Sequence, residues 1–466
     1  MNIERKQLTR RQFVKCAAQG VAAGAAAGFA TDLLAQIAGE RPKPAPDGVE
    51  VLNPRNRVPV SFIIDDSTCL VNLNKFAIPQ FADAWGENSN YHRYNWRDWP
   101  SEIPDDFVRR FADWCGAHGV KGKYSVVPFP ACVGRLDREL PGWTRKEVEA
   151  SIKLLRERLS SNWDFHPEMV THTRVIDLKT GHPYPERGPR FMENWEWTRG
   201  RSVDELAGYM AYALEILKNV GLPCDGITTP GGFGNQVLAE LAQATLQSCR
   251  SVFNAEIPHY FRHVYESGER SVAPRVEYAA GLNGTEPRAV VSIIGCTGDW
   301  TGGWDCTPPA GADKYITPDL QQGRLVEVIQ RGQPACLVSH WTGIYFNGAE
   351  TGFKIFQEVV RRLHQRFDNV IWMKLSELAR YWAAKELTQI SRENGVVVFR
   401  APFGAPDFTV KCAASPNAVP AFEHKAQVQM KEVASISKLA QNTWTRAGSD
   451  VVICFDLPRG ESRMRI

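Results

Sequence analysis

Acidic and histidine side chains stand where apolar runs of the sequence end. Asp65 and Asp66 close one run, His172 closes a second, and His340 closes a third. In a parallel α/β protein the carboxyl ends of the strands meet at one face, so we expect these side chains in one pocket. A carboxylate pair with two imidazoles can hold a divalent metal beside a carboxylate base. The pattern therefore predicts metal-assisted hydrolysis.

Other predicted strand ends carry groups that could bind a substrate. A Pro-Gly-Gly turn follows the run 225–229, and an acidic, tryptophan-rich loop follows the run 290–295. Tryptophan faces stack on sugar rings, although they also pack in cores. The candidate substrate-binding residues are Pro230, Gly231, Gly232, Asp299, Trp300, Trp304 and Trp341.

The elements that must position these residues alternate between strands and helices. Capping boxes at 144–147 and 202–205 predict the start of two helices. The predicted strands are 58–66, 123–128, 165–172, 225–229, 252–254, 290–295, 335–340 and 369–373. Helices are expected at 104–118, 144–160, 202–219, after 235, from 317, at 350–366 and from 376. A count of seven or eight strands favours a parallel α/β barrel over an open doubly wound sheet. No glycine-rich phosphate motif follows any strand, so nucleotide chemistry has no support.

In order and spacing, the residues between Val58 and Trp382 resemble the polysaccharide deacetylase family of metal-dependent amide hydrolases. The resemblance implies a distorted (β/α)7 barrel. It implies that Asp65 is the base, that Asp66 and His172 are metal ligands, and that His340 is the general acid. Pro230-Gly231-Gly232 matches the family's substrate-groove loop.

Two positions depart from the family pattern. The second histidine of the metal motif is replaced by Ile176, and the arginine before the groove loop by Thr228. His166 would lie about 20 Å from His172 along an extended strand, too far to share an ion. We therefore expect His182 to fold back as the third ligand of a divalent metal, expected to be zinc. Asp177 as a ligand, or a site without metal, are the alternatives.

The predicted function is hydrolysis of a C–N amide bond, most simply N-deacetylation of a carbohydrate. One alternative is a non-catalytic carbohydrate-binding protein on a decayed barrel. Another is a glycoside hydrolase that pairs Asp65 or Asp66 with Asp299 or Asp305. That reaction needs two carboxyl groups about 5–10 Å apart across a cleft.

The N-terminal residues predict export. Residues 9–15 read Thr-Arg-Arg-Gln-Phe-Val-Lys and fit the twin-arginine signal, and the apolar stretch 17–30 follows. That stretch is too short to form a stable membrane span, which needs about 20 apolar residues. We expect a removable signal at 1–38, the twin-arginine export machinery as a partner, no stable membrane anchor, and a periplasmic or extracellular location.

Charge and composition also predict the kinds of partner and the domain boundaries. Residues 1–30 hold five of the 55 Lys and Arg residues but one of the 52 acidic residues, so the rest of the chain is nearly neutral. No nucleic-acid partner is expected. We predict a proline-rich linker at 39–57, the barrel at 58–386 and a small β-rich domain at 387–466. The cysteines form no CxxC pair and are expected mostly as buried apolar residues.

Overall fold

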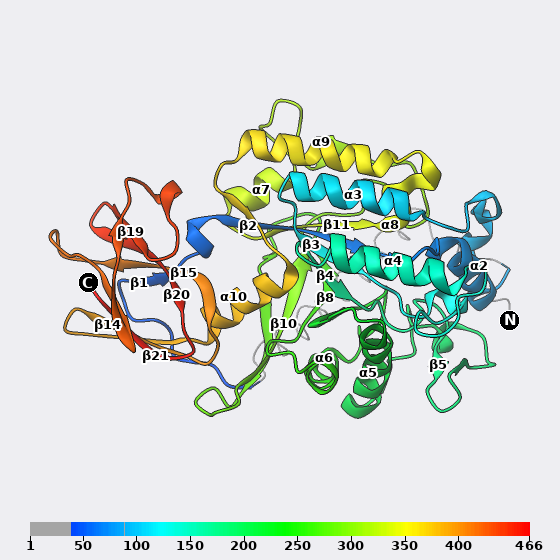
Figure 1. Ribbon diagram of the computed structural model, residues 1–466, viewed down its shortest axis with the longest axis horizontal. Helices are drawn as coiled ribbons and strands as arrows, with labels where there is room; N and C mark the ends of the chain where they lie inside the picture. The colour runs from blue at the N-terminus through cyan, green and yellow to red at the C-terminus, as the bar shows by residue number, and fades with distance from the viewer. Residues whose placement is uncertain (1–38, 88) are drawn as a thin grey trace, which may run out of the picture.

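The computed structural model describes residues 39–87 and 89–466. The predicted signal at 1–38 lies outside the described residues. Among the helices of the described ranges, none is both long and apolar enough to cross a membrane. The chain forms a mixed α/β part followed by a β-sheet region (Figure 1).

Parallel strands form the centre of the α/β part. The first sheet has the order β11 (Ala335–His340), β2 (Val58–Asp65), β3 (Gly122–Ser125), β4 (Trp163–His166). Strand β12 (Val370–Trp372) pairs with the start of β2. β2 is buried at every position, as a continuous apolar run in a covered parallel strand requires.

A second sheet completes the interior of the α/β part. Its order is β7 (Gly226–Thr228), β8 (His259–Val264), β10 (Arg288–Gly295), β9 (Arg275–Ala280), with only β9 antiparallel in this sheet. Hydrogen bonds join the two sheets at two places, beside β4 and β7 and beside β11 and β10. Thr228 N–H donates to the Pro167 carbonyl over 3.0 Å, and Cys296 N–H donates to the Cys336 carbonyl over 2.8 Å. The strands therefore curl into a barrel-like arrangement.

Helices cover the outside of these strands. α3 and α9 lie on one side and α5 and α6 on the other (Figure 1). The capping boxes predicted at Thr144 and Ser202 begin α4 and α5, with both reciprocal hydrogen bonds present. The helix bounds are α2 Leu73–Trp85, α3 Asp105–Ala117, α4 Arg145–Arg158, α5 Val203–Asn219, α6 Leu238–Phe253, α7 Arg324–Gln330, α8 Trp341–Tyr345, α9 Thr351–Arg366 and α10 Leu375–Leu387.

Some expected elements differ in the structure. The predicted strand 252–254 is wrong, because these residues end helix α6 and its left-handed cap at Asn254. The predicted strand 165–172 ends at His166, so the chain up to His172 is a loop. Two short paired segments follow, β5 (Ile176–Asp177) and β6 (His182–Pro183).

The β-rich region consists of two five-stranded sheets. One has the order β1 (Val49–Val51), β15 (Ala405–Ala413), β20 (Asp450–Leu457), β19 (Thr443–Ala447), β18 (Lys431–Glu432). The other has the order β13 (Gln389–Glu393), β14 (Val396–Ala401), β21 (Gly460–Arg465), β16 (Ala421–His424), β17 (Ala426–Gln429). Phe399, Phe408 and Phe455 pack against one another from both sheets. The two sheets therefore form a sandwich around an apolar core.

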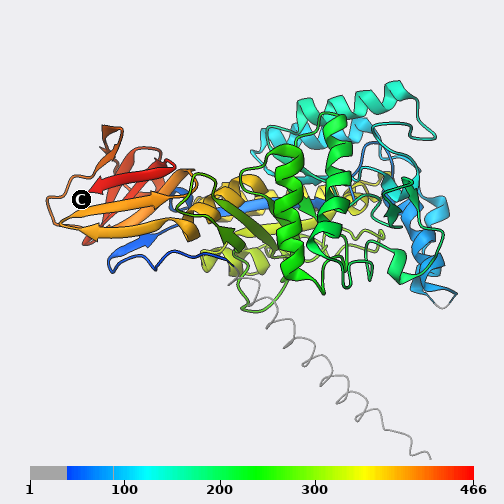
Figure 2. The same ribbon diagram turned by 90° about the horizontal axis from the view of Figure 1, so that it is seen from below.

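The sandwich lies at the end of the barrel remote from α2 (Figures 1 and 2). Residues 49–51, expected to lie in a linker, form its edge strand β1 and pair antiparallel with β15. The linker expectation is therefore wrong for this segment, because the alternation of Val49, Glu50 and Val51 suits a half-buried strand. The cysteines of the described ranges are unpaired, and most are buried.

Candidate active site

A pocket of about 330 Å³ opens at the carboxyl ends of β2 and β11. Asp65, Asp66, His172 and His340 all line it. Parallel register explains half of this arrangement, since His340 is the register partner of Asp65. The other two residues reach the pocket from loops that follow β2 and β4.

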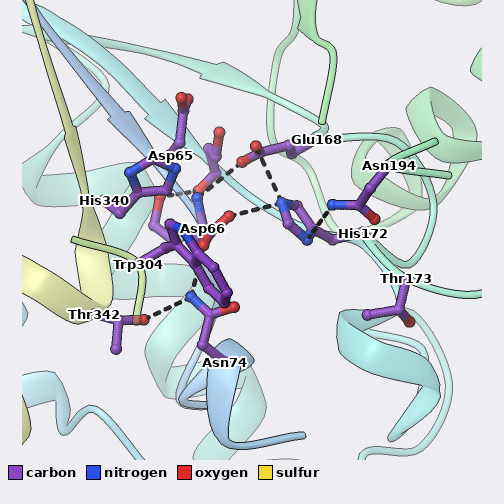
Figure 3. A network of polar contacts seen from close by, with 12 residues as sticks. Asp65, Asp66, Asn74, Glu168, His172, Thr173, Asn194, Trp304, His340 and Thr342 are labelled. Atoms are coloured by element: carbon purple, nitrogen blue, oxygen red, sulfur yellow. Dashed lines mark hydrogen bonds and ion pairs between the residues drawn. The ribbon is translucent and has the colours of Figure 1, made fainter. Parts of the chain in front are cut away.

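A cluster of three buried ligands lies in this pocket (Figure 3). His172 Nε2 lies 2.7 Å from Asp66 Oδ1 and 3.3 Å from Glu168 Oε1. The backbone N–H of Asp66 donates to Glu168 Oε2 over 2.8 Å. In an extended strand Glu168 and His172 would lie about 13 Å apart. They meet because the chain turns after His166, and the shortened strand thereby creates the cluster.

The backbone at this cluster is held in an uncommon conformation. Asp66, Met169 and His172 have φ values of 59°, 55° and 66°. Left-handed backbone is unfavourable for residues other than glycine, and it persists where the surroundings enforce it. Such residues concentrate at functional sites, which agrees with the placement of two of them as candidate ligands.

Glu193 holds the loop that carries His172. Its buried carboxylate accepts the backbone N–H groups of Val170, Thr171 and His172, the last over 2.6 Å, and the Tyr209 hydroxyl. Burial raises the pKa of Glu193 to about 7, against these hydrogen bonds, which lower it. No sequence pattern marks this residue, because it lies in an irregular segment after the 3-10 turn at Pro189–Phe191.

Asp66 is also held from helix α2. Asn74 Nδ2 donates to Asp66 Oδ2 over 2.6 Å and to Thr342 Oγ1 over 3.1 Å (Figure 3). The buried Asp66 Oδ1 lies 2.7 Å from His172 Nε2 and contacts no other hydrogen-bond donor within the described residues. A carboxylate oxygen in that state, beside an imidazole nitrogen and a second carboxylate, fits a divalent cation.

The electrostatics agree with that fit. Burial alone would raise the pKa of Asp66, but the His172 and His340 imidazoles hold it below its usual range. Burial likewise opposes the ionised form of Glu168, whose pKa His172 lowers. The two carboxylates raise the pKa of His172 well above its ordinary value, against its burial. The negative charges of Asp66 and Glu168 therefore favour a positive charge at the centre of the cluster.

Asp65 is paired with a buried lysine. Lys123 is completely buried on β3, and its Nζ donates to Asp65 Oδ1, to the Ile64 carbonyl over 2.9 Å and to Ser125 Oγ over 2.8 Å. These contacts use all three ammonium protons. Burial raises the pKa of Asp65 to about 6, although Lys123 lowers it. Lys123 was not among the predicted residues, because a lysine inside a strand pattern usually lies on a solvated face.

His340 is paired with Asp299. The distance from His340 Nδ1 to Asp299 Oδ2 is 2.7 Å. The same carboxylate oxygen accepts the backbone N–H of Trp304 over 3.1 Å. Burial lowers the pKa of His340, but the Asp299 and Asp66 carboxylates more than offset it and raise the pKa to about 10. The two carboxylates therefore favour the imidazolium form of His340.

Aromatic rings form one wall of the pocket. Phe81, Tyr91, Trp195 and Trp304 line it, and their ring centroids lie 5.3–6.1 Å apart in the contacts they share. Three of the four rings were not among the predicted residues. They come from α2, from the segment after it and from the loop after Glu193. None of them follows a predicted strand, which is the criterion for candidate residues.

The predicted substrate-binding residues divide into two groups. Gly231 and Trp304 line the pocket, and Asp299 holds His340. Pro230 and Gly232 flank Gly231, and a Cβ atom at Gly231 or Gly232 would lie 2.8 Å from the Asn194 carbonyl. Trp300 packs on Tyr315 and does not line the pocket.

Two expectations about individual residues need correction. Trp341 is 1% exposed and packs against Phe107, Phe111 and Tyr124, so it is a core residue and cannot contact a substrate. The group that could hold a metal contains Glu168 as its third member, and His182 is not part of it.

His182 lies exposed on β6, which pairs with β5 and holds it away from the cluster. The alternative ligand Asp177 lies on β5, where its carboxylate accepts the Lys179 N–H. Asp305, named for the glycosidase alternative, accepts the Tyr94 hydroxyl over 2.9 Å.

Comparison with known proteins finds no matching family model and no matching curated protein. Distant similarity is found to solved glycosidase structures. A glycoside hydrolase family 30 subfamily 8 xylanase from Clostridium acetobutylicum has 8% identity and a TM-score of 0.28, over 89% of this chain and 96% of that chain. Thermotoga maritima alpha-fucosidase has 11% identity and a TM-score of 0.27, over 89% and 97%. A beta-arabinopyranosidase has 8% identity and a TM-score of 0.26, over 93% and 59%. Similarity at this level does not assign the chain to a family.

Proposed function

We propose that this chain is a divergent hydrolase of the polysaccharide deacetylase type, which cleaves the C–N amide bond of an N-acylated carbohydrate. The observation that carries the proposal is the joint placement of two sets of groups in one pocket. Asp66, Glu168 and His172 offer three converging ligand atoms, and Asp65 and His340 lie beside them as a base and an acid. Water-driven amide hydrolysis needs all of these functions.

Asp66, Glu168 and His172 would hold the divalent metal, with zinc as the expected ion. When bound, such a metal polarises an amide carbonyl and lowers the pKa of a water molecule. Asp65 accepts the proton of the attacking water. A base works best when its pKa lies near the working pH, and burial brings the pKa of Asp65 to about 6. Lys123 keeps the carboxylate in place through a hydrogen bond to Oδ1.

His340 donates a proton to the departing amine. Its Nδ1 is held by Asp299, so Nε2 is the ring nitrogen left for the substrate. The raised pKa keeps this imidazole protonated at neutral pH, as a general acid requires. The aromatic wall of Phe81, Tyr91, Trp195 and Trp304 supplies apolar faces of the kind that stack on sugar rings.

A glycoside hydrolase is the second candidate, and one observation favours it. Burial raises the pKa of Asp65 to about 6, and Asp299, which this alternative pairs with Asp65, reaches the same strand ends through its 2.7 Å contact with His340. Glycosidases divide the roles of acid and nucleophile between two carboxylates. A non-catalytic carbohydrate-binding protein is the third candidate and would use only the aromatic wall.

We also propose that the chain is exported by the twin-arginine route to the periplasm or beyond. The proposal rests on the residues Thr9 to Lys15 and the apolar stretch after them. That route carries folded proteins, which suits a domain with an internal site of this kind.

One assay on the purified protein separates the three candidates. Acetate release from N-acetylated sugar oligomers and reducing-end release from glycosides are measured on the same preparation, with and without chelator. We expect chelator-sensitive acetate release that Asp66→Ala/His172→Ala abolishes. Reducing-end release that survives this double substitution in chelator would identify a glycosidase using other carboxylates. Sugar binding without release of acetate or of reducing ends would identify a non-catalytic carbohydrate-binding protein.

A further inference from the structure

A second group of metal-binding side chains lies inside the barrel, apart from the pocket. His166 is the last residue of β4 and His259 is the first residue of β8. Both are completely buried, and their Nε2 atoms lie 3.0 Å apart. The proposed hydrolase uses neither imidazole.

Asp164 completes this group on the side remote from the pocket. One of its carboxylate oxygens lies within 4.8 Å of the ligand nitrogens of both histidines. Oδ2 accepts the Ser376 N–H over 2.6 Å, and Oδ1 accepts the Ser376 hydroxyl over 2.9 Å. Lys374 Nζ also lies 3.4 Å from Oδ1, so the remaining acceptor capacity for a cation is on Oδ2, which has one partner among the described residues.

Contacts with neighbouring strands orient the two imidazoles. The second nitrogen of a metal-binding imidazole is normally held by the protein. His166 Nδ1 lies 3.4 Å from the Thr228 hydroxyl, which leaves Nε2 facing His259.

Gly226 leaves room around the pair. A Cβ atom at this position would lie 2.8 Å from His166 Nε2 and 2.8 Å from His259 Cδ2. Any residue other than glycine at position 226 would therefore press on both imidazole rings.

A cavity lies near this group at the other end of the barrel. Lys374 and Ser376, which contact Asp164, line a cavity of about 450 Å³ next to the β-sandwich. The Asp164 side chain itself is 12% exposed. The cavity next to the β-sandwich thus lies on the Asp164 side of the group, and none of the three side chains lines the active-site pocket.

We propose that Asp164, His166 and His259 form a second, structural site for a divalent transition metal of the zinc class. Two imidazole nitrogens and one carboxylate oxygen are the donors that such ions prefer. The ion would join β4 to β8 across the short strand β7. It would stabilise the barrel without taking part in the reaction, so this site does not depend on the proposed function.

The test counts metal in proteins that lack the first cluster. Asp66→Ala/His172→Ala protein is dialysed against Co²⁺ or Zn²⁺, and bound metal is measured by elemental analysis together with the melting temperature. We expect one ion per chain and a melting temperature that rises with added metal. Adding His166→Asn and His259→Asn should remove both the ion and the rise. His118→Asn, on the exposed end of α3, is the matched control and should change neither.

Two results would overturn the proposal. One is a folded Asp66→Ala/His172→Ala protein that binds no ion at saturating Co²⁺, which would leave the pair as a neutral His–His hydrogen bond. The other is an ion that the added His166 and His259 substitutions leave in place. If those substitutions prevent folding, the Co²⁺ absorption of the parent protein decides instead. A tetrahedral band with imidazole ligands supports the site, and a spectrum of hydrated Co²⁺ refutes it.

Discussion

His340 and Asp65 lie side by side in register at the ends of the parallel strands β11 and β2. Each is also tied to a group of opposite charge, His340 to Asp299 and Asp65 to Lys123. The proposed acid and base are thus neighbours with separate partners. Changing one partner should alter one of the two groups and leave the other in place.

Asp299→Asn should shift the pH dependence of the reaction. The Asp299 carboxylate helps to raise the pKa of His340 to about 10, so without it His340 loses its proton at a lower pH. We expect the alkaline limb of the kcat profile to move to lower pH while the metal content stays unchanged. An alkaline limb that does not move would remove His340 from the role of acid.

The same substitution should have a pH-dependent effect on stability. Because the pKa of folded His340 is above the ordinary value of 6.5, protonation favours the folded state. This contribution is complete below pH 6.5 and is lost as the pH rises towards 10. The advantage of the wild type over Asp299→Asn, about 1.5–3 kcal/mol for a hydrogen bond to a charged group, should decline over that window. Urea unfolding at several pH values measures it.

Arg10→Lys/Arg11→Lys should retain the chain inside the cell. The twin-arginine route reads the arginine pair itself, and lysine keeps the charge while changing the group that is read. Cell fractionation should find the wild type outside the inner membrane and the variant in the cytoplasm at its full length. Lys15→Arg, which leaves the pair intact, is the control. Equal export of both variants would contradict the proposed route.

The sequence predicted the regular elements well, for physical reasons that are local. β11 was predicted with the bounds the structure shows, and the helices with capping boxes begin where the boxes place them. Apolar periodicity and capping report on a few neighbouring residues, so they are readable from one chain. The grouping of Asp65 with His340 followed from parallel strands alone.

The rest of the site depends on irregular backbone. Glu168 joins the candidate metal cluster because β4 ends early and the chain turns with left-handed residues at Met169 and His172. Asn74 was missed because α2, which carries Pro79, was not predicted as a helix. No periodic pattern encodes such turns. The sequence therefore predicts His182, and not Glu168, as the third ligand.

Asn74→Ala should weaken metal binding without removing a ligand. Asn74 Nδ2 donates to Asp66 Oδ2 over 2.6 Å and thereby fixes the orientation of the proposed ligand. Loss of such a supporting hydrogen bond costs about 10–100-fold in metal affinity or activity. Competition with a fluorescent chelator measures the change. Gln80→Ala, on the same helix but bonded to the Ala131 carbonyl, should leave the affinity unchanged. Equal affinities for the two variants would contradict the proposed ligand set.

Trp304→Ala should weaken substrate binding more than it slows the chemical step. Its ring lines the pocket and contacts Phe81 and Tyr91, while its backbone N–H, which the variant keeps, holds Asp299. Loss of one stacking face of about 0.5–1.5 kcal/mol should raise KM up to about tenfold, with kcat nearly unchanged. Trp300→Phe, in the same loop but packed on Tyr315, is the matched control. A KM that changes equally in both variants would remove Trp304 from the binding wall.

Lys123→Met should both destabilise the fold and abolish the action of Asp65 as a base. Lys123 is completely buried, and its removal leaves the buried Asp65 carboxylate without its ion-pair partner. Breaking a buried pair in this way costs about 3–5 kcal/mol of unfolding free energy. Lys121→Met is the matched control, because its partner Glu377 and Lys121 itself are each about a third exposed, and such pairs contribute about 0–1 kcal/mol. Adding Asp65→Asn to Lys123→Met should recover stability but not activity, since the uncompensated charge is gone while the base is still missing. If the double variant is less stable than Lys123→Met, the lysine serves packing and the charge pair has no role in holding Asp65.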